Sequence, residues 1–290
     1  MIKKLITAST LVATMAGYTC TMDGTEGIVP ENNLWISTTD KSANLTMTEE
    51  RFNAVIDKVA AVYAPVIAAQ GATLNVERKW NDGTVNAYAS RSGNTWNVFM
   101  FGGLARHTAI TEDGFALVVC HEIGHHIGGA PKKETWWSTT WATNEGQADY
   151  FATLKCLRQA FRSENNAQIV SELNVPSEVQ TACAAQFSAM EDQLICQRGA
   201  MAGMSTAKLF QDLRSQTTAP DFTTPDSKVV SKTDHNHPDT QCRLDTYFAG
   251  ALCEVNDLVD VSDTDESAGV CYRASGDQIG VRPFCWFKPE

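Results

Sequence analysis

Several features are missing from this sequence, and each absence excludes a class of protein. The chain of 290 residues has 23 lysines and arginines against 34 aspartates and glutamates, a net charge of −11. It contains no basic patch and no base-stacking motif, so nothing favours nucleic acid as a partner. It also contains no Cys-x-x-Cys pair, which argues against a zinc ribbon, and no internal repeat.

Long apolar runs are scarce as well. Residues 5–16 form an apolar stretch of the length found in secretory signals, and it follows the basic start Met1-Ile2-Lys3-Lys4. We therefore predict a signal peptide over residues 1–19, cleaved after Ala16 or Thr19. No other apolar run reaches the ~20 residues that span a membrane, so we expect no transmembrane segment in the mature chain. Cys20 follows a weak lipoprotein-type sequence, which leaves a lipid anchor at Cys20 as an alternative.

The number of cysteines supports the prediction that the protein is exported. Of the nine cysteines, eight remain when Cys20 is set aside, an even number that could form up to four disulfides. So many cysteines would be unusual in the cytosol, and they suit an oxidising compartment. We therefore expect an exported protein, in a bacterial periplasm or outside the cell. Cys120 either tethers its own segment to another one or remains a buried thiol.

The most specific feature of the sequence is a five-residue motif, His121-Glu122-Ile123-Gly124-His125. On a helix, residues four apart lie on one face, so His121 and His125 can bind one Zn²⁺ through ring nitrogens. Glu122 then lies beside the metal without binding it. It can act as the general base that takes a proton from a water polarised by the zinc.

The motif is predicted to lie in the second half of a helix over residues 111–127. Thr111 is a plausible N-cap residue, and two acidic residues follow it in the first turn. Apolar residues recur at helical spacing, and Gly128-Gly129 with Pro131 ends the pattern. A helix with incidental buried histidines is the alternative, but three histidines and a glutamate are costly in a core unless something binds them.

A third ligand decides which kind of zinc site is present. The extension H-E-x-x-H-x-x-G-x-x-H fails because position 131 is proline. Downstream, Glu145 opens a helical pattern over about 143–162, and it can complete a His₂Glu site that leaves one position for water. Asp149 lies one turn further on, where it can accept the free ring N–H of a ligand histidine. A structural zinc site would need a fourth protein ligand, and His126, the nearest, points about 100° away round the helix.

These residues resemble a known family. H-E-x-x-H followed by E-x-x-A-D is similar to the gluzincin metallopeptidases, and the twenty-residue interval with N-E-x-x-x-D looks like thermolysin. Asn86-Ala87-Tyr88-Ala89, the strand pattern at 95–100, Gly102-Gly103-Leu104 and His237-Pro238 with Arg243 follow the order found in the family of the CaaX prenyl endopeptidases and HtpX. The resemblance covers residues from about 85 to 245.

The resemblance implies a fold and a set of roles. The fold would be α+β and zincin-like, mainly helical, with a small and mostly antiparallel sheet and an active-site helix carrying the motif. His121, His125 and Glu145 would bind zinc, Glu122 would be the general base, and Asp149 would support a ligand. His237 would stabilise the oxyanion, with His235 as the competing donor, and Arg243 would support that charge or orient carboxylates. Asn86 and the strand residues Asn97, Val98 and Phe99 would bind an extended substrate at the cleft edge.

The sequence also predicts an organisation. An extended arm over 20–45 precedes a catalytic domain over 46–256 and a Cys-bearing tail over 257–290 packed on that domain. Within the domain we expect a long loop at 215–236, between two of the helices. This loop leads to His237 and could act as a lid. Helices are expected at 46–70, 165–173, 176–185, 187–214 and 238–256, and strands at 72–79, 85–90 and 95–101. Trp136, Trp137 and Trp141 are more typical of packing than of a substrate cleft.

The function that these patterns favour is an exported zinc metalloendopeptidase acting on a protein or peptide. The alternative is a non-proteolytic or chaperone-like factor of the cell envelope that retains a gated metal site. The sequence leaves the substrate, the disulfide pairing and the oligomeric state open.

Overall fold

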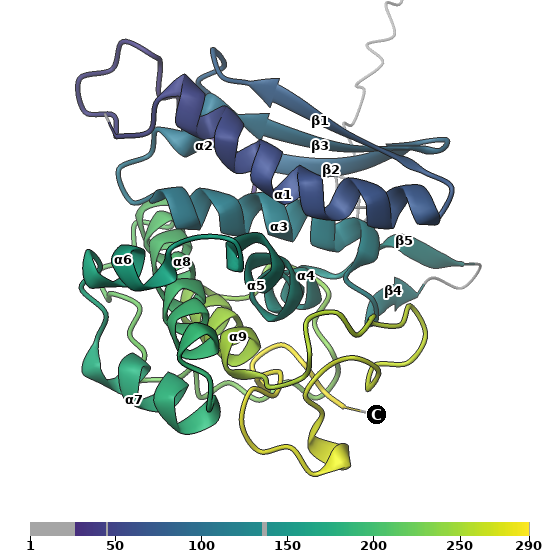
Figure 1. The fold of residues 1–290 in the computed structure, drawn as a ribbon. Coiled ribbons are helices and arrows are strands. Elements are labelled where there is room, and N and C mark those ends of the chain that lie inside the picture. The colour runs from purple at the N-terminus through teal and green to yellow at the C-terminus, as the bar shows by residue number, and fades with distance from the viewer. Residues whose placement is uncertain (1–26, 45, 135–137, 290) are drawn as a thin grey trace, which may run out of the picture.

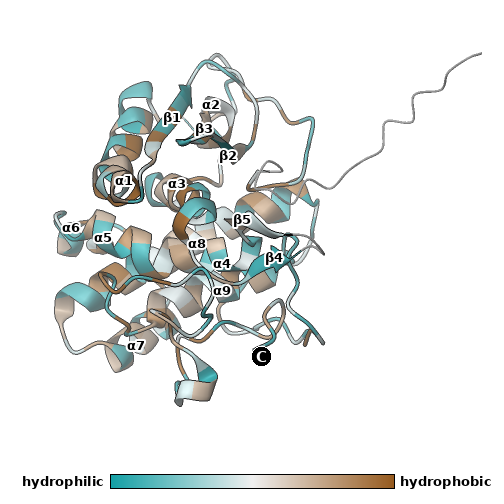
Figure 2. Ribbon diagram, turned by 90° about the vertical axis from the view of Figure 1, so that its right-hand side faces the viewer, coloured by the Kyte–Doolittle hydropathy of each residue, from teal (hydrophilic) through white to brown (hydrophobic). Residues whose placement is uncertain are grey.

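The computed structural model describes residues 27–44, 46–134 and 138–289 (Figure 1). The fold is α+β, as predicted: a small sheet and a long helix form one layer, a set of helices forms another, and one helix runs between them (Figures 1 and 2). The predicted signal peptide, Cys20, Trp136 and Trp137 lie outside the described residues.

The main sheet has three strands, β1 (Thr73–Lys79), β2 (Ala87–Ser92) and β3 (Thr95–Phe101), in the order β1-β3-β2. β2 and β3 form an antiparallel hairpin whose turn contains Gly93 at φ +57°, a conformation that favours glycine. β1 pairs with β3 in parallel. β3 is therefore the central strand, with both of its backbone edges already paired.

A second, two-stranded antiparallel sheet was not predicted. It consists of β4 (Lys132–Glu134) and β5 (Thr139–Thr143). These strands are short and carry little alternation between apolar and polar residues, so the sequence has no strong strand pattern there. The hairpin follows the metal-motif helix and leads directly into the helix that begins at Glu145.

Two long helices flank the inner layer. α1 (Glu49–Ala69) begins after the N-cap residue Thr48 and contacts β1 and the motif helix. By length and composition α1 could cross a membrane, but six of its residues, from Phe52 to Ile67, are buried within the fold. α3 (Glu112–Ile127) begins where Thr111 caps the Gly114 N–H at 3.0 Å, as expected. It is buried along most of its length, because the sheet covers one side and helices cover the other (Figure 2).

The helical layer largely follows the sequence pattern. The predicted helix over 143–162 is a continuous stack of α4, one π-helical turn (η1) and α5, and the other helices lie within a few residues of their predicted ranges. The remaining elements are α2 (Gly102–Ala105), α4 (Glu145–Phe151), η1 (Ala152–Cys156), α5 (Leu157–Phe161), α6 (Asn166–Ser171), α7 (Ser177–Gln186), α8 (Met190–Leu213), α9 (Thr240–Leu252) and the 3₁₀ turn η2 (Arg273–Ser275).

Four disulfides cross-link the described chain, and they account for all eight cysteines beyond Cys20. They are Cys120–Cys156, Cys183–Cys196, Cys242–Cys285 and Cys253–Cys271. The first joins α3 to η1, so Cys120 is a tether rather than a free thiol. Four disulfides in one chain are typical of a protein that folds in an oxidising environment.

The C-terminal tail packs on the helix that carries Glu145. The buried Trp286 ring lies so close to Gly146 that a Cβ there would meet ring atoms at 2.3 Å. The buried Arg282 donates to the Gln147 side chain at 3.0 Å. Two of the disulfides tie this tail to α9 and its C-terminal end. The tail thus helps to fix the start of α4.

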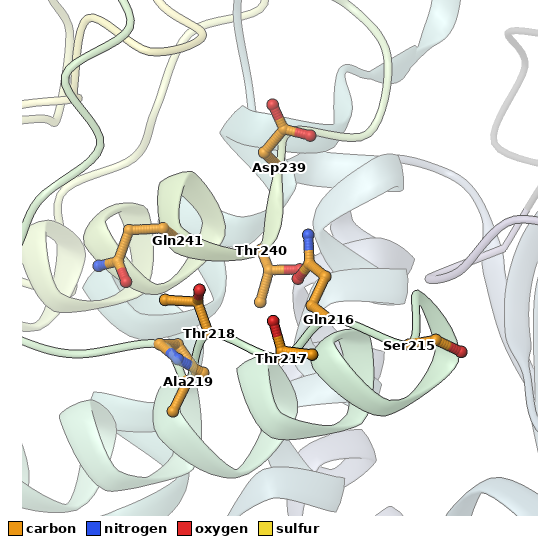
Figure 3. A pocket seen from close by; sticks show the side chains of 9 residues that line it. Ser215, Gln216, Thr217, Thr218, Ala219, Asp239, Thr240 and Gln241 are labelled. Carbon is orange, nitrogen blue, oxygen red and sulfur yellow. The ribbon is translucent and has the colours of Figure 1, made fainter.

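The long segment between α8 and α9 has no regular secondary structure, as predicted. Its first part, residues 215–220, turns back against the start of α9 and lines a hollow of about 390 Å³ with residues 239–241 (Figure 3). The side chains around this hollow are mostly polar amides and hydroxyls. None of the predicted metal ligands lines it. The segment then continues to His237.

Candidate metal centre

The structure brings together the three predicted metal ligands. His121 and His125 lie one turn apart on α3, and Glu145 is the first residue of α4. The His121 Nε2 atom is 3.3 Å from Glu145 Oε2, and His125 Nε2 is 3.6 Å from Glu145 Oε1. One ligand atom from each residue lies within 4.8 Å of the other two, close enough for all three to bind a single ion.

The Nδ1 atom of each histidine, which points away from the cluster, faces an oxygen atom of the chain. His125 Nδ1 lies 2.8 Å from the Thr143 carbonyl oxygen, which can only accept, so Nδ1 carries the proton. His121 Nδ1 lies 2.8 Å from the buried Asp149 Oδ1 atom, at ion-pair distance, so a proton is placed on Nδ1 here as well. Each histidine therefore turns the lone pair of Nε2 toward the oxygens of Glu145.

This arrangement places acceptors opposite acceptors in a buried site. Among the described residues, His121 Nε2, His125 Nε2 and Glu145 Oε2 have no hydrogen-bond partner of proper geometry. Buried polar atoms without partners are costly, and each calls for an explanation such as an ion. A cation between them satisfies all three atoms at once. Two imidazoles and one carboxylate suit a divalent metal such as zinc.

A second proton on a histidine would also relieve the contacts between acceptors. The two histidines differ in the pKa at which they would take it up. Burial lowers the pKa of His125 to about 4, and the nearby Glu145 only partly offsets this, so His125 stays neutral at pH 7. Burial alone would lower the pKa of His121 too, but Asp149 and Glu145 outweigh it and raise that pKa to about 9. A metal at Nε2 would compete with this second proton.

Asp149 forms the centre of a fully buried network behind the ligands. Arg243 Nε and Nη2 donate to its two carboxylate oxygens at 2.8 and 2.7 Å, and the Tyr247 hydroxyl donates to it at 2.7 Å. Burial would raise the pKa of Asp149, but Arg243 and His121 hold it below its usual range. Asp149 therefore remains an anion that orients the His121 ring. Arg243 acts on this carboxylate, which is the second of the two roles predicted for it.

Glu122 lies next to the ligands with both carboxylate oxygens buried and without hydrogen-bond partners in the described part of the chain. Burial raises the pKa of its carboxyl to about 8, and the negative charge of Glu145 adds to this, while His121 opposes it. A positive ion at the site would favour the ionised form. A carboxyl in such surroundings is suited to accept and return a proton near neutral pH.

His237 reaches the cluster from the long loop before α9. Its Nε2 atom lies 3.3 Å from Glu145 Oε2 and donates a hydrogen bond to the Gly27 carbonyl oxygen at 2.7 Å. His235, the competing donor, has its Nδ1 atom 3.4 Å from the Asn144 amide. It lines a different hollow of about 600 Å³ beside the β4–β5 hairpin. Of the two histidines, His237 is the one at the metal cluster.

The prediction that the strand at 95–100 pairs with an extended substrate is wrong. Because β3 is the central strand, its backbone is paired on both sides and cannot add a further strand. The Asn97 carbonyl also accepts from His126 Nε2 at 3.1 Å, Val98 is buried in the core, and Phe99 stacks on Tyr88 at 4.3 Å between ring centroids. The free edge of the sheet nearest these residues belongs instead to β2.

Residues 27–29 occupy that edge, which the sequence did not predict. The Ile28 N–H donates to the Ala87 carbonyl at 2.9 Å, and the Asn86 side-chain amide donates to the Val29 carbonyl at 3.1 Å. Arg243 Nη1 donates to the Ile28 carbonyl at 2.6 Å. Asn86, expected to bind substrate, thus binds the chain's own segment. The apolar pair Ile28-Val29 indicates that this part of the arm is buried, although it does not indicate against which strand.

His126 has a structural role. Its ring lies between the Trp96 and Trp141 rings, with centroid distances of 5.3 and 5.0 Å. Both ring nitrogens have partners, since Arg91 Nε donates to Nδ1 at 3.3 Å and Nε2 faces Asn97. His126 is therefore not a fourth ligand, and Trp141 belongs to this packing.

Comparisons of the chain with protein-family models, with curated proteins and with solved structures gave no match. The interpretation of the site therefore depends on its own geometry and on the sequence motifs.

Proposed function

We propose that this protein is an exported zinc metalloendopeptidase. The single observation that carries the proposal is the convergence of His121, His125 and Glu145, whose unpartnered ligand atoms face one another in a buried site beside the partnerless Glu122. Three protein ligands of this kind leave a coordination position open, as in catalytic rather than structural zinc sites. The motif resemblance to the gluzincin peptidases supports the same assignment.

Zinc, when bound, would polarise a water molecule and the carbonyl of a peptide. The residues of the chain would do the rest. Glu122 would take a proton from the attacking water and deliver it to the leaving amine. His237, with its Nε2 atom at the edge of the cluster, would donate a hydrogen bond to the oxygen that becomes negative. Asp149 would keep the His121 ring in place, and Arg243 would keep Asp149 ionised.

One observation favours the second candidate, a non-proteolytic factor with a gated metal site. Gly27, Ile28 and Val29 are buried, and they cover the β2 edge beside His237. If this segment neither moves nor is cut, a substrate peptide cannot take its place at the β2 edge. The four disulfides suit an envelope or extracellular protein in either case.

The two candidates are separated by Glu122→Gln. In the peptidase this change should reduce the cleavage of an unstructured protein such as casein by roughly a thousandfold or more, with zinc still bound. Zinc content and casein cleavage are measured on the same sample. Glu112→Gln is the matched control, because Glu112 lies on the same helix with an exposed side chain. Zinc-loaded wild-type protein without activity above that of Glu122→Gln would rule out the peptidase.

A further inference from the structure

We propose that the first substrate of this site is the chain itself, and that the site hydrolyses its own Gly27–Ile28 bond. The inference rests on the proposed peptidase function and names a substrate for it. It starts from the position of residues 27–29, which lie against an open sheet edge and beside the ligand cluster at the same time.

The Gly27 carbonyl lies where a scissile carbonyl would lie. Its oxygen accepts a hydrogen bond from His237 Nε2 at 2.7 Å, and the same nitrogen is 3.3 Å from the ligand atom Glu145 Oε2. The donor that we assign to the oxyanion therefore already holds a peptide carbonyl beside the metal ligands. In the described part of the chain, no other carbonyl oxygen is hydrogen-bonded to His237.

The residues after Gly27 are held as a bound peptide would be. The Ile28 N–H pairs with the edge carbonyl of Ala87, as in the addition of a strand to a sheet. The Ile28 carbonyl is fixed by the buried Arg243, and Val29 exchanges two hydrogen bonds with the Asn86 side chain, at 3.4 and 3.1 Å. The Ile28 side chain is fully buried within the main core. This side of the bond is thus firmly anchored.

Only glycine fits at position 27. Its φ is +79°, and an added Cβ would meet the Ala87 carbonyl oxygen at 2.4 Å and the Asn86 Oδ1 atom at 2.5 Å. Both neighbours belong to the segment that holds the peptide, so neither can move without loosening it. The sequence therefore places glycine at a position beside His237 where a side chain would collide with the sheet edge.

The proposed step is an ordinary hydrolysis. The oxygen of one water molecule forms a bond to the Gly27 carbonyl carbon, and the bond from that carbon to the Ile28 nitrogen breaks. Glu122 transfers one proton of the water to the Ile28 nitrogen, and the second proton passes from the new carboxyl group to the released amine. The products are a carboxylate at Gly27 and a new amino terminus at Ile28. Because Ile28 and Val29 are anchored in the core, the fold retains them, and the residues up to Gly27 are released.

The experiment uses the full chain, purified without metal and then given Zn²⁺. We expect a new amino-terminal sequence Ile28-Val29-Pro30 and the corresponding loss of mass. The rate should not depend on protein concentration, because the peptide is already in place within each molecule. In a mixture with active protein, Glu122→Gln should remain uncut.

Gly27→Ala should slow this cleavage by roughly tenfold or more, because the added methyl group displaces the carbonyl from His237. Gly71→Ala is the matched control. Gly71 has nearly the same φ, +78°, but an added Cβ there meets nothing within 4 Å. It therefore carries a similar backbone strain without the steric clash, and its self-cleavage should match that of the wild type.

Casein cleavage, measured in the same preparations, distinguishes two failures. If zinc-loaded protein cleaves casein through Glu122 but leaves the Gly27–Ile28 bond intact, the self-cleavage is wrong and the peptidase stands. If neither substrate is cut, both proposals fail. A cut at another bond, a rate proportional to protein concentration, or equal cleavage of Gly27→Ala and Gly71→Ala would also overturn the inference.

Discussion

Helix α3 carries a polar cluster at each end, and the two clusters differ in how their donors and acceptors are paired. Near its start, Arg198 on α8 donates to Asp113 at 2.9 and 2.6 Å, to Glu164 at 2.8 Å and to Asn166 at 2.5 Å. There, donors face acceptors, and Lys58 adds a second cation on Glu164. Near its end, His121 and His125 face Glu145 with acceptors opposite acceptors.

The difference teaches how to tell a structural cluster from a functional one. Both clusters bring ionisable side chains together beside α3, so the presence of such groups alone does not distinguish them. The Arg198 cluster is complete by itself, because its positive and negative groups satisfy one another. The histidine cluster contains no such permanent cation, so its contacts are relieved by a metal ion or by a second proton on His121. This division between the Arg198 cluster and the histidine cluster can be tested by substitution on either side.

The first prediction concerns the self-contained cluster. Arg198→Met leaves Asp113 and Glu164 without their shared partner, so it should lower the free energy of unfolding by about 3–5 kcal/mol. Zinc affinity should be unchanged. Denaturant unfolding and a zinc titration measure the two quantities. Arg51→Met, which breaks only the exposed 3.7 Å pair with Glu112, is the control and should cost less than about 1 kcal/mol. A large loss of zinc affinity in Arg198→Met would break the comparison.

The second prediction concerns the metal. At a free Zn²⁺ concentration about 100 times Kd, the native state should gain roughly 2.7 kcal/mol over the metal-free protein. His125→Ala should abolish this gain, because it removes a ligand. His107→Ala is the control, since His107 is also buried but lies outside the cluster. Calorimetric unfolding with and without zinc gives the result, and an equal gain in His125→Ala would exclude the proposed ligand set.

The third prediction concerns the support of the ligands. Asp149→Asn removes the charge that orients His121, so zinc affinity should fall by about 10–100-fold. A competition titration against a chelator measures it. Asp57→Asn, at an exposed ion pair with Arg78, should leave the affinity unaltered. An unchanged affinity in Asp149→Asn would show that Asp149 serves only to hold Arg243 and Tyr247 in the fold.

The smallest effect is a pH dependence of the Arg198 cluster. Burial would raise the pKa of Glu164, but Lys58 and Arg198 outweigh it and hold that pKa below 4.5. A lowered pKa means that the ionised carboxylate stabilises the fold at higher pH, and that this contribution disappears as the pH falls below about 4.5. The difference in unfolding free energy between wild type and Glu164→Gln should therefore be constant from pH 7 to 5 and shrink below. A difference that grows on acidification would contradict this sign.

Much of the site could be predicted from the sequence, because its parts are local. The helical spacing of His121 and His125, the cap at Thr111 and the acidic start of α4 depend on residues close in the chain. The same is true of most helix and strand ranges. Local periodicity and capping were sufficient for these elements.

The errors arose where distant segments meet. Strand order is not encoded in local alternation, so β3 was expected at an edge although β1 pairs with it in parallel. The docking of residues 27–29 depends on contacts with Asn86, His237 and Arg243, which lie 57 to 215 positions further along the chain. No pattern within the arm could specify those partners.

The Cys120–Cys156 disulfide has a consequence for the order in which the metal site can form. Its two cysteines are 36 positions apart, and His121, His125 and Glu145 all lie between them. Once this bond forms, the three ligands belong to one closed covalent loop even before the chain folds, so their concentration relative to one another is raised. The oxidised but unfolded chain should therefore retain some affinity for metal, and the reduced chain much less. Formation of this disulfide before metal binding would therefore favour loading of the site.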